Sequence, residues 1–514
     1  MPVSRLSPQN LVILSLLLIA PYSTPDQASA DAPDTPENQK RPHFVFLITD
    51  DVSPDDLGTY GNRVVKTPHL DALAGRGLRF DNAFLTTSSC SPSRCSIITG
   101  RYPHNTGAPE LHTRLPKSQR TFVRCLRDTG YFTMLSGKNH MADPEQLGFD
   151  QASDGRPSGG EKWVDHLRDR PRDRPFFAWF ASHDAHHAFT INDQAPTFDP
   201  AGVPVPPMMF DGAGTRKELA GYYHEVARTD FLLGQVVAEL KRQGILKQTY
   251  IIYCSDNGRP FPRCKTFLYD SGIQTPLVIA GPSVSAGASV SGEPSVSGEP
   301  SVSVGSTDSM VSSVDFAATI LDLAGVQALP TSQGTSFAKV LEDPKWESRE
   351  VIFAERNWHV YQNHQRAVRT KQWLYIRNAW PDRYALSAES GKFRFQAVKE
   401  LWTAANDGRL TPAQAKLTLS RQPAEELYRV TDDPYQFDNL ANAPEHQQTL
   451  RQMRSLLDRW ATETADSIPS DPTPDRGPLH KFAAKPKDFK HREMPGDATN
   501  AVTNNAPGPV GLHD

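Results

Sequence analysis

The chain has few cysteines, little net charge and no apolar run long enough to cross a bilayer comfortably, and each shortage excludes a class of protein. Five cysteines in 514 residues are too few for a disulfide-based fold, although Cys254 and Cys264 remain a possible pair. A net charge of -4 is too small to indicate nucleic acid or a membrane surface as partner, so any attraction of an anion must be local. With 22% charged and 38% hydrophobic residues, the chain is an ordinary globular protein long enough for two cores.

The N-terminus predicts an export signal. Arg5 precedes the apolar run 11–20, and residues 28–30 (Ala-Ser-Ala) form a small-x-small cleavage site. Because the run is short, a permanent membrane anchor is the weaker alternative. We expect residues 1–30 to be a signal peptide and the mature chain to be exported, periplasmic or secreted, without membrane contact after cleavage.

Short apolar segments alternate with helical patterns along the first two thirds of the chain. Strands are expected at 43–49, 78–84, 131–136, 175–181 and 250–253, and helices at 68–77, 121–129, 218–243 and 310–324. This alternation predicts an α/β fold, a doubly wound and mostly parallel sheet flanked by helices. Ligands of such sheets bind beyond the carboxyl ends of the strands, so polar residues there are the first candidates for a site.

The remaining chain differs in composition. Residues 283–306 repeat the unit Ser-Val-Ser-Gly-Glu-Pro and predict a low-complexity surface loop. We expect a catalytic domain over 31–350, a smaller C-terminal α+β domain over 351–466, and an extended or disordered polar, proline-rich tail over 467–514. In the smaller domain, strands are expected at 372–377 and 424–430, and helices at 412–420 and 444–465.

Oxygen-bearing side chains follow two of the predicted strands. Asp50 and Asp51 end the first strand, and Asp256 and Asn257 follow the strand at 250–253. Taken singly, such pairs are more often solvated turns. Together at strand ends they fit a hard divalent cation, Ca²⁺ or Mg²⁺, because all-oxygen ligation favours these ions over zinc, and the sequence holds no Cys-x-x-Cys pair.

Basic residues and histidines follow other strands. Lys138 and His140 lie just past the strand at 131–136, where the alternative is a solvated loop. His186 lies in a histidine-rich turn after an aromatic strand, and its neighbours His183 and His187 are the alternatives that bond only to backbone. These residues are candidates for proton transfer and anion binding.

The stretch 90–101 reads as a polar turn that runs into a helix ending at Gly100. On a helix, Arg94 leans toward the side chain at 90, four residues earlier. A group at position 90 would therefore meet free backbone N–H groups, the positive end of the helix dipole and a guanidinium, which suits an anion with tetrahedral oxygens. The alternative is a capped helix with a buried thiol at Cys90.

The longer pattern Cys-x-Pro-Ser-Arg-x-Ser-x-x-Thr-Gly-Arg at 90–101 resembles the signature of the formylglycine-dependent sulfatases of the alkaline-phosphatase superfamily. The resemblance covers about 42–466 and is nearest to the heparan N-sulfatases (N-sulfoglucosamine sulfohydrolases). It also rests on the segments 183–186, 256–262, 366–369 and 426–434. It implies an alkaline-phosphatase-like fold for the larger domain.

The resemblance implies that a separate maturation enzyme oxidises Cys90 to formylglycine, whose hydrate attacks sulfur. It also implies one Ca²⁺, or Mg²⁺, held by residue 90 together with Asp50, Asp51, Asp256 and Asn257. The second hydroxyl of a geminal diol lets a covalent sulfate ester collapse by elimination, which a plain serine does not allow.

The family's other roles map onto matching positions here. Arg94 and Lys138 would hold the hydrate and the sulfate, and Asp256 would help to deprotonate the attacking hydroxyl. His186 would protonate the leaving group, and His140 would take the remaining hydroxyl proton to expel sulfate. Cations gathered around the sulfate oxygens stabilise the charge of the transition state.

Two departures from the family pattern bear on rate and substrate. The resemblance implies that Lys265 binds the sulfate of the substrate during catalysis. It stands where the most similar family members have arginine, and a lysine makes a weaker, not bidentate, contact with sulfate. Ala185 replaces a proline before His186, so we expect a looser turn there.

The sequence thus predicts an exported sulfatase acting on a sulfated saccharide, with N-sulfoglucosamine of heparan type favoured over an O-sulfated sugar. A superfamily phosphatase or phosphodiesterase would favour Ser or Thr at position 90 and often two metals. The remaining rival is an inactive module that binds glycans. Linkage and oligomeric state stay open.

Substrate contact is expected from the start of the C-terminal domain. Glu355, Arg356, His359, His364 and Arg366 cluster there, and the alternative is a solvated charged face. A sugar needs fixed donors and acceptors around its hydroxyls, and the tryptophan before His359 offers an apolar wall. We therefore predict that His359 contacts the sugar rather than the sulfate.

Overall fold

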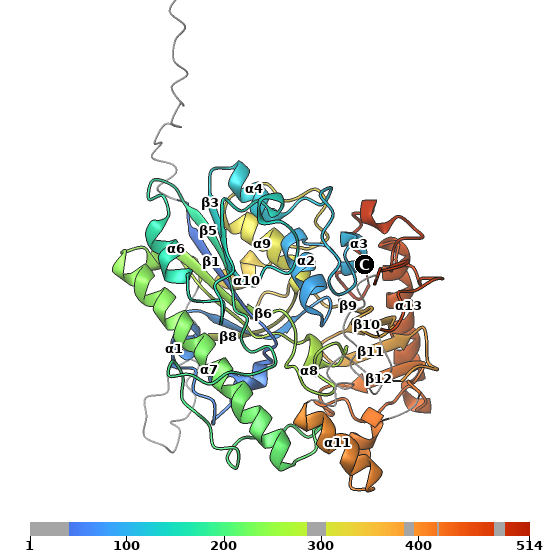
Figure 1. Cartoon of the computed structure of the whole chain (residues 1–514). Coiled ribbons are helices and arrows are strands. Elements are labelled where there is room, and N and C mark those ends of the chain that lie inside the picture. Colours follow the sequence, from blue (N-terminus) through green and yellow to red (C-terminus); the bar gives the residue numbers. More distant parts are fainter. Residues whose placement is uncertain (1–40, 285–304, 385–394, 419–420, 477–488, 514) are drawn as a thin grey trace, which may run out of the picture.

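The computed structural model describes residues 41–284, 305–384, 395–418, 421–476 and 489–513. The expected signal peptide 1–30 and most of the expected loop 283–306 lie outside these residues. Within them, the chain forms a large sheet between two layers of helices and a smaller sheet beside it (Figure 1).

The large sheet has eight strands in the order β4-β3-β5-β1-β6-β7-β2-β8. Its strands are β1 (His43–Thr49), β2 (Leu78–Phe84), β3 (Phe132–Gly137), β4 (Gln151–Ser153), β5 (Phe176–Ala181), β6 (Thr249–Ser255), β7 (Leu277–Ala280) and β8 (Gly305–Ser312). Strand β7 pairs antiparallel with β6 and β2, and the other neighbouring strands of this sheet are parallel. The predicted doubly wound, mostly parallel sheet is confirmed.

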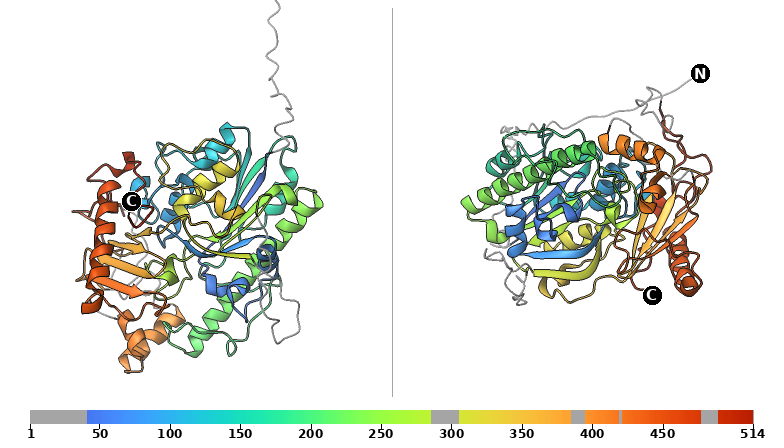
Figure 2. Two further views of the ribbon diagram at one scale, coloured as in Figure 1. Left: turned by 180° about the vertical axis from the view of Figure 1, so that it is seen from behind. Right: turned by 90° about the horizontal axis from the view of Figure 1, so that it is seen from below.

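Both faces of this sheet are covered by helices, which explains why its central strands are continuous apolar runs. Along β1, Phe44 and Phe46 belong to one apolar cluster, while Val45 and Leu47 belong to the other, because successive side chains alternate. The first cluster packs against α2 (Cys90–Thr99), α4 (Phe122–Asp128), α9 (Phe316–Leu323) and α10 (Ala338–Glu342). The second packs against α1 (Pro68–Gly75), α6 (Trp163–Asp169) and α7 (Ala213–Arg242) (Figures 1 and 2).

The small sheet is antiparallel, in the order β12-β11-β10-β9. It comprises β9 (Ile352–Arg356), β10 (Gln365–Arg369), β11 (Trp373–Asn378) and β12 (Glu425–Arg429). Helix α13 (Gln447–Glu463) packs on it through a face that includes Leu450, Leu457 and Trp460. This agrees with the expected smaller α+β unit at the C-terminal end.

A helix that the sequence pattern did not indicate ties the two parts together. Helix α11 (Gln396–Asn406) places Ala397 and Leu401 in the core around α7. The carboxylate of Glu400 accepts hydrogen bonds from the N–H groups of Gly214 and Thr215, at 2.7 and 2.8 Å, in the first turn of α7. The free N–H groups at a helix start are a favourable site for a carboxylate.

Two expected helices were partly wrong. The segment 310–324 starts as the end of β8, where Val311 pairs with Ala83 of β2, then forms a 3-10 turn before α9 begins at Phe316. Pairing with a buried neighbouring strand outweighed the helical spacing. The segment 412–420 holds only the short helix α12 (Pro412–Ala415) and a 3-10 turn at Lys416–Thr418 within the described residues.

The C-terminal tail is mostly irregular in its described parts, but it is not disordered there. The guanidinium of Arg101, which is 1% exposed, donates to Asn505 Oδ1 at 2.6 Å and to the carbonyl of Asn504 at 2.7 Å. Residues 470–473 and 491–493 bond to each other and to Glu110. A polar composition therefore did not prevent ordering, since buried donors on the catalytic domain need the tail's carbonyl groups.

All five cysteines are buried and free in the structure, so Cys254 and Cys264 form no disulfide. None of the helices in the described residues combines the length and the hydropathy that a membrane span requires.

Candidate active site

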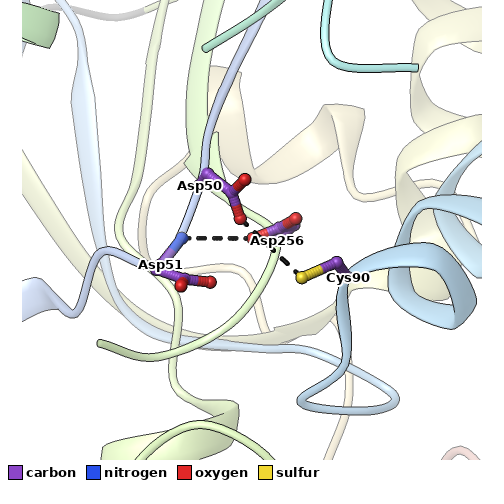
Figure 3. A group of neighbouring side chains, drawn as sticks. All are labelled: Asp50, Asp51, Cys90 and Asp256. Atoms are coloured by element: carbon purple, nitrogen blue, oxygen red, sulfur yellow. Dashed lines mark hydrogen bonds between the residues drawn. The ribbon is translucent and has the colours of Figure 1, made fainter. Parts of the chain in front are cut away.

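The site lies at the carboxyl ends of β1 and β6, where the start of α2 meets the sheet (Figure 3). Strands β1 and β6 are paired up to Thr49 and Ser255, so the residues that follow them emerge side by side. This register brings Asp50 and Asp51 next to Asp256. Cys90 is the first residue of α2 and faces the same group.

Four of the expected metal ligands form one buried cluster. Ligand atoms of Asp50, Asp51, Cys90 and Asp256 all lie within 4.8 Å of one another. Nδ2 of Asn257 donates to Asp51 Oδ1 at 2.6 Å and to the next carbonyl, which leaves Oδ1 of Asn257 as a possible ligand atom.

Two oxygens of this group have no hydrogen-bond partner in the part of the chain that the structure describes. They are Oδ2 of Asp51 and Oδ1 of Asn257, both buried. A buried acceptor without a donor is costly, and a cation would satisfy both oxygens. The donor set is mainly oxygen, as Ca²⁺ and Mg²⁺ prefer, so the residues present fit a hard divalent cation.

The electrostatics of the carboxylates point the same way. Burial raises the pKa of Asp51 well above its usual range and that of Asp256 above its ordinary value, and the charge of Asp50 raises both further. For Asp50, burial is outweighed by Lys138 and other cations, which hold the pKa well below its usual range. Crowded carboxylates of this kind ionise together only when a positive charge compensates them.

Each of the three carboxylates has a basic partner from a different part of the chain. Arg94 Nε donates to Asp256 Oδ2 at 2.8 Å, Lys265 Nζ donates to Asp51 Oδ1 at 2.6 Å, and Lys138 Nζ donates to Asp50 Oδ2. Arg94 and Lys265 are buried. The structure thus brings together the three basic residues that the sequence analysis selected.

The thiol of Cys90 is a poor nucleophile in its unmodified form. Burial raises its pKa to about 12, although Lys138 and Lys265 act in the opposite direction. The thiolate is the reactive species, so this thiol is protonated at neutral pH. Its Sγ donates weakly to Asp50 Oδ1 at 3.8 Å.

The three histidines after β5 have different hydrogen-bond partners. His183 Nε2 lies 3.2 Å from Asp154 Oδ1, and His187 Nε2 lies 3.5 Å from Glu218 Oε1. His186 is exposed, and its Nδ1 bonds to the carbonyl of His187 at 2.8 Å. The first two are therefore engaged with carboxylates.

The turn that carries His186 is tied to the site. The N–H of Asp50 donates to the carbonyl of Asp184 at 3.0 Å, and the N–H of Ala185 donates to the carbonyl of Asp50 at 2.7 Å. Ala185 is fully buried. These two backbone bonds hold the turn on both sides of Ala185, and a looser turn than in the family stays a prediction.

His140 follows β3 and pairs with a histidine that the sequence analysis did not select. His140 Nε2 lies 2.7 Å from His112 Nδ1. His112 lies in a segment without strand or helix pattern, so no sequence signal indicated it. A cavity of about 520 Å³ opens beside Lys138 and His140, and Arg156 and His183 line it further out. This volume is in the range of small-ligand pockets.

His359 lies close to the start of α2. Its Nδ1 is 2.7 Å from Ser89 Oγ, next to Cys90, and the residue is 7% exposed. Its neighbours Glu355, Arg356, His364 and Arg366 are buried as well. The alternative of a solvated charged face is wrong, because these groups pair with each other and with the catalytic domain at the junction of the two sheets.

Comparison with known proteins agrees with this geometry. The model of the sulfatase family matches residues 42–326, more than half of the chain. A second family model, described as the C-terminal part of N-sulphoglucosamine sulphohydrolase, matches residues 298–386.

Among curated proteins, the N-sulphoglucosamine sulphohydrolase of Homo sapiens is 28% identical over 477 residues, covering 83% of this chain and 91% of that protein. An ulvan-active sulfatase of Formosa agariphila is 27% identical over 480 residues, covering 83% of this chain and 76% of that protein.

Solved structures share the fold. One described as a complex with its substrate D-glucosamine-2-N,6-O-disulfate has a TM-score of 0.63 at 19% identity and covers 82% of this chain and 98% of its own. The phosphonate monoester hydrolase of Agrobacterium radiobacter has a TM-score of 0.60 at 17% identity and covers 81% and 94%. The shared fold therefore spans more than one hydrolysis reaction, and the family match decides between them: the chain belongs to the sulfatase family, the hydrolases of sulfate esters and sulfamides.

Proposed function

We propose that this protein is an exported sulfatase that removes sulfate from N-sulfoglucosamine in heparan-type saccharides. The observation that supports this choice of substrate is the match of residues 298–386 to the C-terminal part of N-sulphoglucosamine sulphohydrolase. That stretch contains His359, whose ring lies 2.7 Å from Ser89 beside the reacting position. A residue there is suited to contact the sugar that carries the sulfate.

Residue 90 is proposed to act as formylglycine, made from Cys90 by a separate maturation enzyme. The complete signature at 90–101 supports this, and so does the raised pKa of the buried thiol, which leaves unmodified Cys90 unreactive at neutral pH. As its hydrate, formylglycine supplies two hydroxyl groups on one carbon, one to attack sulfur and one to release the product.

A Ca²⁺ ion, with Mg²⁺ as second choice, is proposed to bind Asp50, Asp51, Asp256, Asn257 and residue 90. The unpartnered oxygens of Asp51 and Asn257 support this assignment. A divalent cation here supplies positive charge that stabilises the transition state and lets the carboxylates ionise together.

The chain's own cations prepare the sulfate site. Arg94, Lys138 and Lys265 converge on the carboxylates around residue 90 from three parts of the chain. Their N–H groups are suited to hold sulfate oxygens through charge-assisted hydrogen bonds. Asp256, one of the carboxylates around residue 90, is suited to accept the proton of the attacking hydroxyl.

Two histidines are proposed to move the remaining protons. Because His186 Nδ1 bonds to a carbonyl, that nitrogen carries a hydrogen, and Nε2 is the atom that exchanges a proton with the leaving amine or hydroxyl. His140, beside Lys138, takes up the proton whose loss allows sulfate to depart.

A second candidate is an O-sulfatase acting on another sulfated polysaccharide. The similarity to the ulvan-active sulfatase, at 27% identity over 480 residues, favours it. Neither the metal cluster nor the cations around residue 90 distinguish an N-sulfate from an O-sulfate, since both present the same sulfate oxygens. The residues around the sugar make this distinction.

The test is sulfate release by the matured full-length protein from a panel of compounds. The panel holds N-sulfoglucosamine, glucosamine 6-O-sulfate, an ulvan oligosaccharide, an aryl sulfate and a phosphonate monoester, with Cys90→Ala as the matched inactive control. We expect the highest kcat/KM on N-sulfoglucosamine. Preference for an O-sulfated sugar would establish the second candidate, and hydrolysis of only the phosphonate would refute both.

A further inference from the structure

The segment between α3 (Pro103–Thr106) and α4 places His112 against His140 in an arrangement with two unusual backbone conformations. The two ring centroids are 4.8 Å apart, and Nδ1 of His112 lies 2.7 Å from Nε2 of His140. The φ angles are 68° at His112 and 56° at His140. Left-handed backbone is uncommon outside glycine and concentrates at functional sites, so the position of the two histidines indicates a functional role.

The segment that carries His112 is fastened to the catalytic centre and to its surroundings. The N–H of His112 donates to Ser91 Oγ at 2.8 Å, directly beside residue 90. The N–H of Leu111 donates to the carbonyl of Trp358 at 3.2 Å. Glu110 is buried and accepts hydrogen bonds from two residues of the C-terminal tail. These anchors hold the His112 ring in place against His140.

The surroundings of His140 determine which ring nitrogen carries its hydrogen. Its Nδ1 is buried and has no hydrogen-bond partner among the described residues. Burial, with Lys138, His112 and Arg94, lowers the pKa of His140 to about 2, so the ring is neutral. A hydrogen on Nε2 makes the 2.7 Å contact with His112 Nδ1 a hydrogen bond, whereas a hydrogen on Nδ1 would have no acceptor among the described residues, so Nδ1 is the bare nitrogen.

We propose that His112 is the positioning residue of His140: it accepts the Nε2 hydrogen, fixes the ring, and keeps the Nδ1 lone pair turned to the catalytic centre. The proposal deepens the proposed function and rests on it, since it assumes that His140 takes up a proton during turnover. That proton binds at Nδ1, and the Nε2 hydrogen stays in place in its bond to His112. The arrangement resembles the general use of a second group to orient a catalytic histidine.

Kinetics of three variants test the proposal. His112→Ala removes the acceptor, His112→Gln keeps one through its side-chain carbonyl, and Arg114→Ala is the matched control on the same exposed segment. We expect His112→Ala to lower kcat by about 10- to 100-fold, part of the contribution of a positioned base, with little change in KM. His112→Gln should recover most of this loss, and Arg114→Ala should behave as the unchanged protein.

A second readout does not depend on turnover. In protein labelled with ¹⁵N-histidine, His140, assigned from the spectrum of His140→Ala, should show a hydrogen on Nε2 and a bare Nδ1. In His112→Ala, it should become a mixture of tautomers. Unchanged kcat in His112→Ala would overturn the proposal, and so would equal losses in the Ala and Gln variants with an unchanged tautomer. If the unmutated protein releases no sulfate from any compound, the proposed function fails, and the tautomer still decides whether His112 positions His140.

Discussion

Two buried clusters of charged groups differ in how completely their polar atoms are hydrogen-bonded within the described residues. The first is the site around Asp51 and Asp256. The second lies at the junction of the two sheets, where His104 contacts Glu355 at 2.6 Å and Arg366 contacts Asp466 at 2.7 and 2.8 Å. Both clusters are almost inaccessible to solvent.

At the junction, charge is balanced. Burial alone would raise the pKa of Glu355 and Asp466, but His104 and Arg366 outweigh it and lower both. At the site, burial prevails and raises the pKa of Asp51 and Asp256, and two buried oxygens have no hydrogen-bond partner among the described residues. We call the junction cluster complete, because its charged groups are paired, and it holds the two parts together. We call the site cluster incomplete, because two of its buried oxygens are left to bind a ligand. The following predictions test this contrast, from the largest expected effect to the smallest.

Replacing the residue at the centre of the incomplete cluster should abolish turnover without unfolding the protein. Cys90→Ala should lower kcat by a factor on the order of 10⁴ or more, the scale of removing a nucleophile. Cys90→Ser should at best become trapped as its sulfate ester, because it lacks the second hydroxyl. Sulfate release, the thermal unfolding midpoint and peptide mass spectrometry of residue 90 provide the measurement. Active material with only intact cysteine at 90 would contradict the mechanism.

Removing the metal should disable the site and leave the junction intact. Chelation should abolish sulfate release and lower the thermal midpoint, since free metal at 100 times its Kd stabilises a protein by about 2.7 kcal/mol. Adding Ca²⁺ should restore both sulfate release and the thermal unfolding midpoint. In the Asp51→Asn variant, chelator should lower the thermal midpoint less than in the unmutated protein. Full activity after exhaustive dialysis against chelator would exclude the metal assignment.

Breaking the complete cluster should cost stability. Asp466→Asn leaves the buried guanidinium of Arg366 without its bidentate partner, so the free energy of unfolding should fall by about 3–5 kcal/mol. The control is Asp128→Asn at the exposed pair Arg120–Asp128, where a loss of about 0.2–1 kcal/mol is expected. Equal, small losses in urea unfolding would show that the junction is no more stabilising than a surface pair.

His359 lies beside Ser89, next to residue 90, and its loss should reduce turnover of a sugar substrate more than turnover of a substrate without a sugar. His359→Ala should reduce kcat/KM for N-sulfoglucosamine about 10-fold more than for an aryl sulfate, which is the scale of one lost hydrogen bond. Only the sugar substrate uses that contact. Equal losses on both compounds would assign His359 to the support of Ser89 and the sulfate site.

The junction should also give stability a shallow pH optimum. Its carboxylates have lowered pKa values, so their contribution is present above the ordinary values of 3.8 and 4.5 and is lost as the pH falls further. His104 has a raised pKa, because Glu355 outweighs burial, so its contribution is present below 6.5 and is lost at higher pH. Urea midpoints should peak between these values, and His104→Gln should remove the decline on the alkaline side. A decline that persists in this variant would refute the assignment.

Much of the architecture followed from local patterns. The apolar runs at 43–49 and 175–181 became β1 and β5, and the acids after the first run lie at the predicted sheet edge. These predictions are right because a strand buried on both faces must be apolar, and because the carboxyl ends of parallel strands lie at the same edge of the sheet. The segment 310–315 failed because pairing with β2, distant in sequence, determined its conformation.

The sequence by itself determined the family, the mostly parallel sheet and the grouping of Asp50, Asp51, Cys90 and Asp256, since each depends on a local run or a spaced signature. Only the tertiary structure decided the contacts that have no local pattern. His359 reaches Ser89 across 270 positions, His112 meets His140 across 28, and Arg101 binds carbonyls of the distant tail. Such contacts depend on how whole helices and strands pack, because the packing determines which polar groups come within hydrogen-bond distance. No spacing along the sequence indicates these contacts.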